Sequence, residues 1–275
     1  MPTHSASTPI SVLDVDLWSF FFERTVLDYP EDHGKDTYKL VSVPTFPICQ
    51  FADSITAIFV DLSNAKRHTL QSLRQTSIET GRGLLTKWNW QKGDIMAIFS
   101  PNSADIAAIV AATLWAGGVV CPLNNLYTVG ELSSLLRSSG AKALTTHVSC
   151  LDAACEAALI VGLPLNRIIL VGEPDVKGKV KHFDELKEER EVVKKARVDS
   201  KEDLAFLVYS SGTTGLPKGV MLSHENIVAN ILQSLDAERD AMNWRDDSMI
   251  SFLPMFHIYG EFSDHAISCA SCATC

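Results

Sequence analysis

Short apolar runs alternate with amphipathic segments over residues 93–171. Apolar runs of strand length lie at 94–99, 119–122, 143–146 and 167–171. Segments with helical periodicity begin after Ser103 and after Thr128, and a third covers 151–160. Thr128 and Glu131 have the spacing of a capping box. This order predicts an α/β fold with doubly wound, mostly parallel sheets and flanking helices.

The chain then becomes more polar before the apolar pattern resumes. The stretch from about 173 to 203 is charged and contains Gly and Pro, which indicates a connector. Two further strands are predicted at 204–208 and 249–253. We therefore expect a first α/β subdomain over residues 1–200 and the start of a second over residues 201–260.

Two segments do not fit this organisation. Residues 34–50 have no clear periodicity and are interpreted as an irregular insertion, with an error in the gene model or a functional loop as alternatives. Residues 261–275 form a tail in which Cys269, Cys272 and Cys275 have C-x-x-C-x-x-C spacing. A fourth ligand is missing, so we predict no metal or cluster site there.

Composition and charge narrow the class of protein. The chain has 275 residues, of which 46% are hydrophobic and 21% charged, enough for one large or two medium domains. A net charge of -9 argues against a nucleic-acid surface. The N-terminus carries Asp14 and Asp16 where a signal peptide is apolar, so secretion is not expected. The seven cysteines, an odd count with four scattered and three crowded near residue 275, imply no disulfide framework and favour a reducing, cytoplasmic setting.

One uncharged stretch reaches the length of a membrane helix. It runs from Ile106 to Leu123, but five alanines, the Gly117-Gly118 pair and Pro122 divide it into a helix, a turn and a short strand. No Lys or Arg anchors flank it. We predict no membrane span.

A run rich in hydroxyl groups and glycines follows the strand predicted at 204–208. Residues 209–224 read YSSGTTGLPKGVMLSH, and Ser223 is placed to cap a helix that begins near Glu225. Glycines that accept positive φ let backbone N–H groups approach an anion, hydroxyls add donors, and a lysine adds positive charge. The glycines are Gly212, Gly215 and Gly219, the hydroxyl residues are Ser210, Ser211, Thr213 and Thr214, and the lysine is Lys218. The run predicts a loop that cradles a polyphosphate.

Two other interpretations of this run are a Walker A loop and a flexible linker. The Walker pattern requires Gly-Lys-Ser/Thr, whereas Lys218 lies between Pro217 and Gly219. A linker rarely places Pro-Lys-Gly between two strongly patterned elements. A phosphate loop agrees better with the residues.

YSSGTTGLPKG resembles the signature loop of the adenylate-forming superfamily, which includes acyl- and aryl-CoA ligases, luciferases and nonribosomal peptide adenylation domains. Residues 253–260, LPMFHIYG, are similar to the acid-binding segment of 4-coumarate:CoA ligases. The resemblance runs from about residue 12 to residue 260 and is interrupted at 34–50. The chain therefore looks like the N-terminal fragment of a member of this superfamily, with a particular likeness to 4-coumarate:CoA ligase-like enzymes and a tail at 261–275 that is foreign to them.

The resemblance implies ATP-dependent activation of a carboxylic acid to an acyl-adenylate, followed by transfer to CoA. It implies ATP, Mg²⁺ and, as cosubstrate, CoA. His257 and Tyr259 match positions that line the acid pocket; without the neighbouring motif, a lone histidine between Phe256 and Ile258 would read as a core residue. The positions that match ATP-phosphate contacts are Ser210, Ser211, Gly212, Thr213, Thr214, Gly215 and Lys218. The family's catalytic lysine has no counterpart in these residues.

The expected partners are thus a small carboxylic acid, ATP and CoA. Because the catalytic lysine and the CoA-binding elements are missing, we expect the isolated chain to be inactive or nearly so. A noncatalytic nucleotide-binding fragment and an adenylating enzyme with a non-CoA acceptor are the alternatives. A cytoplasmic location is expected, and a full-length form with a peroxisomal address is an alternative that the C-terminal residues 273–275 do not support.

Overall fold

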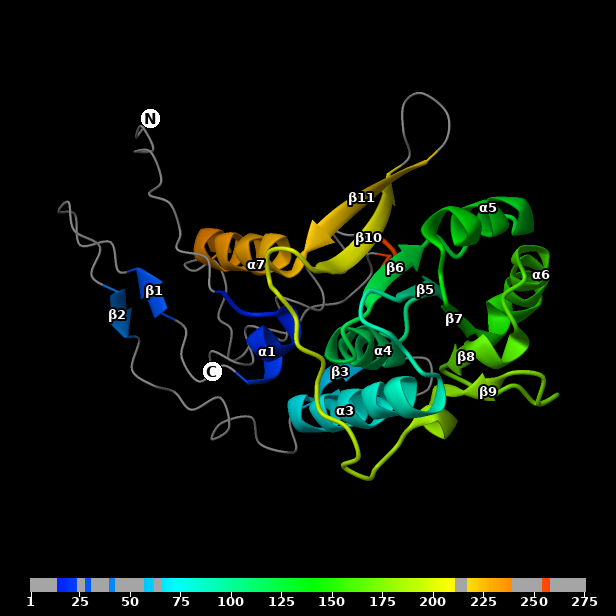
Figure 1. The fold of residues 1–275 in the computed structure, drawn as a ribbon, viewed down its shortest axis with the longest axis horizontal. Helices are drawn as coiled ribbons and strands as arrows, with labels where there is room; N and C mark the ends of the chain where they lie inside the picture. Colours follow the sequence, from blue (N-terminus) through cyan, green and yellow to red (C-terminus); the bar gives the residue numbers. More distant parts are fainter. Residues whose placement is uncertain are drawn as a thin grey trace.

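The computed structural model describes residues 14–23, 28–30, 40–42, 57–61, 66–210, 217–238 and 254–257. Its centre is a seven-stranded sheet with the order β11-β10-β6-β5-β7-β8-β9 (Figure 1). The strands are β5 (Ile95–Phe99), β6 (Val119–Leu123), β7 (Ala143–His147), β8 (Ile168–Val171), β9 (Lys181–His182), β10 (Leu204–Ser210) and β11 (Lys218–Ser223). All neighbouring pairs are parallel except β10 with β11, which is antiparallel.

Helices cover both faces of this sheet. They are α1 (Leu17–Phe22), α3 (Leu70–Lys87), α4 (Ala104–Trp115), α5 (Val129–Ser139), α6 (Leu151–Val161) and α7 (His224–Glu238), with 3-10 turns η1 (Val148–Cys150), η2 (Leu165–Arg167) and η3 (Phe183–Leu186). One apolar core joins α1, α3, α4 and α7 to the sheet, and the other joins α5 and α6 to the opposite face. The predicted α/β fold with a doubly wound, mostly parallel sheet is confirmed.

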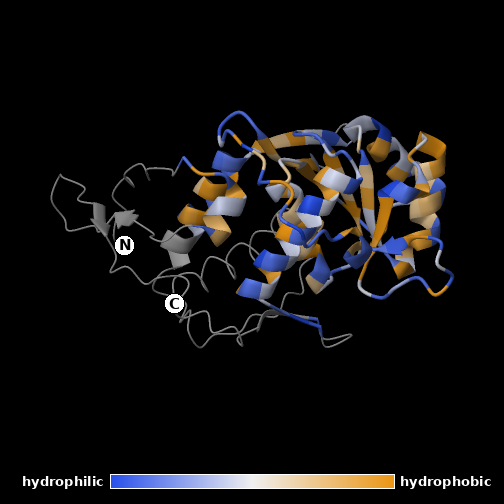
Figure 2. Cartoon of the chain, turned by 60° about the horizontal axis from the view of Figure 1, so that its bottom comes forward, coloured by the Kyte–Doolittle hydropathy of each residue, from blue (hydrophilic) through white to orange (hydrophobic). Residues whose placement is uncertain are grey.

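Strand β5 shows how the sequence produces the two cores. Its side chains alternate, so that Met96 and Ile98 enter the core beneath α4 while Ala97 and Phe99 enter the core beneath α5 and α6. All four are at most 4% exposed. Burial on both faces explains why this strand is a continuous apolar run, and the central strands are coloured mostly for hydrophobic residues in Figure 2.

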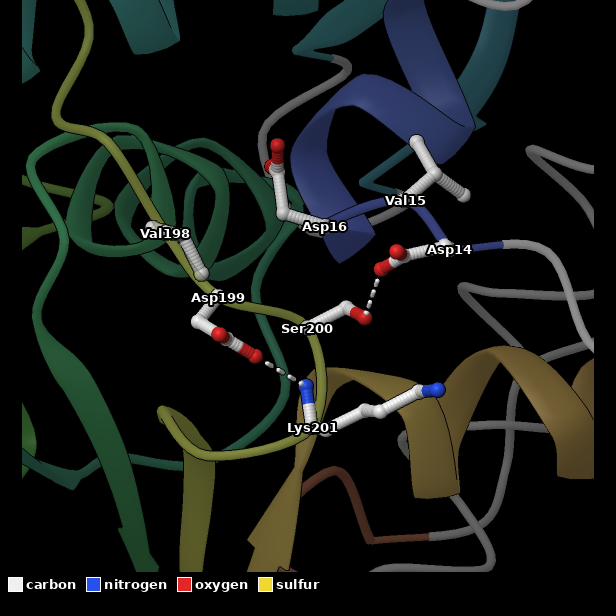
Figure 3. A pocket seen from close by; sticks show the side chains of 7 residues that line it. All are labelled: Asp14, Val15, Asp16, Val198, Asp199, Ser200 and Lys201. Atoms are coloured by element: carbon white, nitrogen blue, oxygen red, sulfur yellow. Dashed lines mark hydrogen bonds between the residues drawn. The ribbon is translucent and has the colours of Figure 1, made fainter.

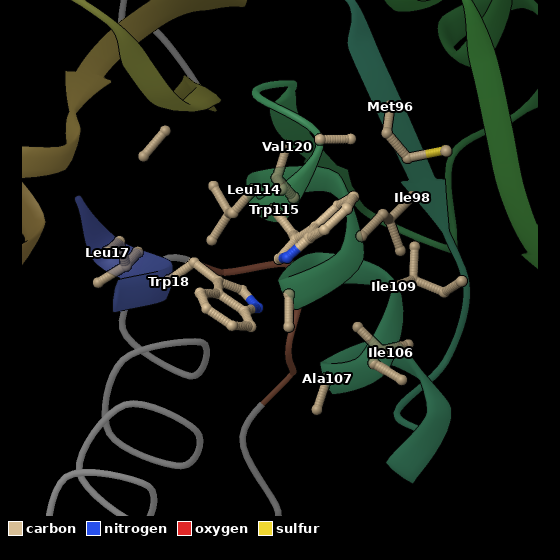
Figure 4. Close-up of a cluster of buried hydrophobic side chains, with 14 of the residues drawn as sticks. Leu17, Trp18, Met96, Ile98, Ile106, Ala107, Ile109, Leu114, Trp115 and Val120 are labelled. Carbon is tan, nitrogen blue, oxygen red and sulfur yellow. The ribbon is translucent and has the colours of Figure 1, made fainter. Parts of the chain in front are cut away.

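Helix α4 supplies much of the first core. Figure 4 shows Ile109 and Trp115 of this helix beside Ile98 of β5, and Leu114 toward Leu17 and Trp18 of α1. Full burial of such a side chain stabilises the fold by about 1.5–3 kcal/mol. The helix ends at Trp115, Gly117 takes φ +73°, and β6 follows. The apolar stretch at 106–123 is therefore divided as predicted, and the described part of the chain has no helix long and apolar enough to cross a membrane.

The predicted helix caps are present. The Ser103 hydroxyl accepts from the Asp105 N–H at the start of α4. Thr128 and Glu131 form the predicted capping box, in which the Thr128 N–H donates to Glu131 Oε2 at 2.7 Å. Because a cap needs only residues three positions apart, local sequence is enough to locate these helix starts.

Several elements were not predicted. Helix α3 faces the core with small and polar side chains such as Ser77, Thr80 and Gly81, which weakens its apolar periodicity. Its start is marked by a capping box in which Ser72 replaces the usual Glu or Gln. Strand β9 and turn η3 lie in the predicted connector, where Phe183 is fully buried. Strand β9 and turn η3 are short and lie in a charged stretch, so the sequence pattern did not predict them.

Two small antiparallel sheets precede α3 in the chain. Strand β1 (Asp28–Pro30) pairs with β2 (Leu40–Ser42), and β3 (Ala57–Val60) pairs with β4 (Arg67–Thr69). Part of the segment predicted as an irregular insertion, residues 34–50, therefore forms a strand. The rest of that segment, the predicted strand at 249–253 and the cysteine-containing tail lie outside the described residues.

The predicted boundary near residue 200 falls within one continuous sheet. Strand β10 pairs with β6 through Phe206 and Val120, so strands from the described parts of both predicted subdomains belong to one sheet. The subdomain division stays a prediction.

Helices α1 and α7 meet at a buried histidine. His224 is 1% exposed, and its Nδ1 accepts a hydrogen bond from the Leu17 N–H at 3.1 Å. Burial lowers the pKa of His224 to about 4, although Asp16 and Asp203 nearby favour its protonated form. Lys195 and Lys92 oppose protonation and pair with those two aspartates. His224 is therefore neutral at pH 7.

We predict that this histidine makes the fold sensitive to mild acid. The unfolded chain takes up the proton near the ordinary His pKa of about 6.5, whereas folded His224 does so only near pH 4. The free energy of unfolding should thus fall as pH drops from 6.5 to 4, by about 3 kcal/mol. Urea unfolding measured across this range tests the prediction.

His224→Asn provides the control, because its amide oxygen can accept from the Leu17 N–H and does not titrate. The slope between pH 6.5 and about 5 should largely disappear in this variant. An unchanged slope would contradict the assignment. The lowered pKa values of Asp16 and Asp203 reduce stability mainly below about pH 5, in parent and variant alike, so the difference between the two pH profiles reports His224.

Candidate functional site

The hydroxyl- and glycine-rich run lies at the carboxyl end of β10. Ser210 ends this strand and faces Lys218, the first residue of β11, across the antiparallel pair. The Ser210 hydroxyl donates to the Lys218 carbonyl oxygen at 3.4 Å, and both residues are exposed. The hairpin therefore holds the two ends of the predicted phosphate loop side by side.

The structure corrects the predicted course of the chain after this loop. Residues 218–223 belong to the run that was predicted as a loop before a helix near Glu225, but they form β11, which pairs with six residues of β10. Helix α7 then begins at His224, and the Ser223 hydroxyl accepts from the Asn226 N–H at 3.3 Å as predicted for a cap. The apolar sequence Val220-Met221-Leu222 favours a strand when a partner strand is available.

Gly219 has a different role from the one predicted. It lies in β11 and is not among the glycines with positive φ. A Cβ at this position would lie 3.1 Å from Leu207 Cδ1 and 3.5 Å from Tyr209 Cε1. The missing side chain lets neighbouring side chains of β10 lie against the backbone.

Tyr209 fastens the hairpin to helix α5. Its hydroxyl donates to Ser138 Oγ at 3.0 Å, and its ring lies against Gly219. Burial raises the pKa of Tyr209, so the hydroxyl stays protonated and can donate. A hydrogen bond to α5 therefore fixes the end of β10, which leads into the predicted phosphate loop.

The carboxyl edge of the sheet also contains a switch point. Helix α4 leaves β5 toward one face, whereas α6 follows β7 on the opposite face, and β5 and β7 are neighbours. Ligands of doubly wound sheets bind in the crevice outside the carboxyl ends of strands at such a point. The loop between β5 and α4, residues 100–103, lies at this crevice.

Part of the second motif docks on that loop. The Met255 N–H donates to Asn102 Oδ1 at 2.9 Å, and Met255 is buried against the first core. The His257 N–H donates to the Pro254 carbonyl oxygen at 3.0 Å, which forms a turn and leaves His257 exposed. The structure thus places Ser210, Lys218 and His257 on elements that meet the same edge of the sheet.

The remaining predicted site residues lie outside the described part of the chain. They are Ser211, Gly212, Thr213, Thr214, Gly215 and Tyr259. Their assignment stays a prediction from the motif.

A buried carboxylate near this edge was missed by sequence reasoning. Asp105 is fully buried in the first turn of α4; its Oδ1 lies 2.7 Å from Lys66 Nζ and 3.1 Å from His68 Nε2. Its Oδ2 accepts from the Gly172 N–H at 3.0 Å, just after β8. Burial alone raises the pKa of Asp105, but the bonds from His68 and Lys66 hold it below its ordinary value. Asp105 joins three separate segments. The only feature of the sequence that could have indicated its role is a charged residue at the start of an apolar helix.

A cavity at the opposite end of β10 is unsuited to phosphate. It has a volume of about 400 Å³, and Figure 3 shows Asp14, Asp16 and Asp199 among the residues that line it. The Ser200 hydroxyl donates to Asp14 Oδ1 at 2.7 Å, which ties the residues just before α1 to the chain before β10. Carboxylates repel phosphate, so this cavity is interpreted as a joint between segments. Among the residues with described positions, no group of three or more His, Cys, Asp or Glu is arranged to hold a metal.

Known proteins share this sequence pattern. The family model described as AMP-binding enzyme matches residues 50–275. A 4-coumarate-CoA ligase 1 of Narcissus pseudonarcissus is 32% identical over 215 residues, which cover 76% of this chain and 37% of that protein. 4-coumarate--CoA ligase 4 of Arabidopsis thaliana is 32% identical over 212 residues, with coverage of 75% and 37%. The chain therefore spans 37% of the length of these curated relatives.

Solved structures share the fold. A red-emitting luciferase from Phrixothrix hirtus gives a TM-score of 0.74 at 19% identity, covering 94% of this chain and 45% of that one. ATP-bound MatB from Rhodopseudomonas palustris gives 0.67 at 23% identity, covering 94% and 44%. At these identities the likeness establishes the architecture alone.

Proposed function

Because this chain belongs to the family of AMP-binding enzymes, we propose that it forms the nucleotide-binding part of an acid:CoA ligase. The proposed reaction activates a carboxylic acid with ATP and then transfers the acyl group to CoA. The observation that carries this proposal is the β10–β11 hairpin, which holds Ser210 opposite Lys218 at the carboxyl edge of the sheet. A polyphosphate bound between Ser210 and Lys218 would lie at the crevice where doubly wound sheets bind ligands.

In the proposed first step, a carboxylate oxygen of the acid attacks the α-phosphorus of ATP. A new P–O bond forms, and the bond to the leaving pyrophosphate breaks. Negative charge grows on the departing oxygen, where the ammonium group of Lys218 and the Ser210 hydroxyl would stabilise it. Ser211, Gly212, Thr213, Thr214 and Gly215 are proposed to complete the donor set from the same loop.

In the proposed second step, the thiol sulfur of CoA attacks the acyl carbonyl carbon and AMP leaves. His257 and Tyr259 are proposed to border the acid and the acyl group. The exposed position of His257, beside the loop that carries Asn102, supports that placement. Mg²⁺ would accompany ATP as a counter-charge for its phosphates.

The acid is proposed to be an aryl or fatty carboxylic acid. Two relatives are named for 4-coumarate, and this name describes those proteins. The motif residues match both aryl and aliphatic members of the family, so the test includes both kinds of acid.

ATP–pyrophosphate exchange tests the proposal. The longest protein that the transcript encodes is assayed with radiolabelled pyrophosphate and 4-coumarate or a fatty acid. Acid-dependent exchange, together with a CoA thioester that forms only when CoA is added, is the expected result. Exchange without thioester formation would assign a different acceptor, and absence of both exchange and Mg²⁺-ATP binding by calorimetry would overturn the proposal.

A further inference from the structure

A second hollow lies at the amino edge of the sheet, opposite the proposed nucleotide site. It is bordered by the carboxyl ends of α3, α5 and α6 and by the residues that precede β5, β7 and β8. Its volume is about 470 Å³, within the range of roughly 300–1,000 Å³ typical of small-molecule sites. The proposed reaction uses none of these residues.

Three cationic residues from different segments line this hollow. Arg137 lies in the last turn of α5, Lys142 precedes β7, and Arg167 precedes β8. Asp94 is the one carboxylate residue in the lining, and its Oδ2 already accepts from the Gln91 N–H at 2.8 Å. Three cations against one carboxylate make the hollow locally positive on a chain with net charge -9.

These cations have few protein partners. No carboxylate within the described ranges forms an ion pair with Arg137, Lys142 or Arg167. The negative ends of α5 and α6 account for part of the preference for positive charge here. A single nearby cation is enough for this attraction between a helix end and positive charge, so it does not explain three cations around one hollow.

The rest of the lining is apolar and includes an aromatic ring. Arg167 Cζ lies 5.3 Å from the centre of the Trp88 ring, a cation–π distance that orients the guanidinium. Val161 and Leu163, both partly exposed, contribute aliphatic surface. Flat apolar groups can stack on such surfaces while an acidic group meets the cations.

We propose that this hollow is a binding site for a small organic anion with a flat apolar body and one carboxylate, sulfonate or phosphate group. The anionic group contacts Arg137, Lys142 and Arg167, and the apolar body lies on Trp88 and the neighbouring aliphatic side chains. This site is independent of nucleotide binding, because it lies at the other edge of the sheet.

Fluorescent probes test the proposal on the 275-residue chain itself. The aromatic sulfonate 8-anilinonaphthalene-1-sulfonate is titrated alongside N-phenyl-1-naphthylamine, a similar aromatic without the charge. The sulfonate should bind at least about tenfold more tightly, and its affinity should fall as salt is raised from about 0.05 to 0.5 M. Arg137→Gln combined with Arg167→Gln should lower the affinity for the sulfonate at least about tenfold.

The matched control is Lys181→Gln combined with Arg190→Gln, which removes the same charge from exposed positions that pair with Glu185 and Glu188. This control should bind the sulfonate like the parent chain. Equal affinity in the two double variants, or equal binding of the charged and uncharged probes, would overturn the proposal. Circular dichroism verifies that the variants fold. Trp88→Leu is an independent variant that keeps all three cations and should lower the affinity for the aromatic probe.

Discussion

Replacement of Asp105 by alanine is expected to lower the free energy of unfolding by about 3–5 kcal/mol, the range for breaking a buried charge network by removing one partner. The carboxylate is fully buried and holds Lys66, His68 and the Gly172 N–H. Its removal leaves the buried His68 ring and the Gly172 N–H without this acceptor and separates β4, α4 and the end of β8.

Chemical denaturation at pH 7 measures this effect. Asp152→Ala is the matched control, because Asp152 also lies in the first turn of a helix on the same sheet but is exposed. It should cost less than about 1 kcal/mol. Similar losses for the two variants would show that Asp105 acts only through the helix dipole. Asp105→Asn should give an intermediate loss, since the amide keeps one acceptor and loses the charge.

Replacement of Lys218 by alanine is expected to lower kcat/KM for pyrophosphate formation by about 10²–10³-fold, as for other preorganised donors to developing charge. This prediction rests on the proposed function and applies to the longest protein that the transcript encodes. The side chain is exposed at the start of β11, so the free energy of unfolding should change by less than about 0.5 kcal/mol.

Initial rates of acid-dependent pyrophosphate release measure this loss. Lys194→Ala removes an exposed ammonium group from the segment before β10 and should leave the rate unchanged. Lys218→Arg should recover part of the activity, because it restores the charge with a different geometry. A Lys218→Ala variant as active as the parent would exclude a role for this lysine in the first step.

Much of the fold was predictable because its signals are local. The strand at 94–99 and the helix after Ser103 were identified from apolar runs and from capping residues a few positions away. The parallel order followed from strand–helix alternation, since a crossover helix returns the chain in the same direction. Helix α3 and strand β9 were missed because their buried positions carry few large apolar side chains or belong to a very short element.

The residues of the candidate site stay a prediction from the motif, and only part of their geometry follows from local sequence. The motif singled out Ser210 and Lys218, but their pairing across a hairpin depends on where β11 finds a partner. The hydrogen bond from Met255 to Asn102 joins residues 153 positions apart, and no local pattern predicts such a contact.

The sequence by itself determined which segments become strands and helices between residues 93 and 171 and where the helices in that range begin, and it predicts which residues would bind phosphate. Those properties depend on side-chain periodicity and on groups within about one helical turn. Only the tertiary structure decided that Asp105 meets Lys66, His68 and Gly172, and that Arg137, Lys142 and Arg167 surround one hollow. Such contacts form between residues distant in the chain, because sheet order and helix packing set their distances and local sequence does not.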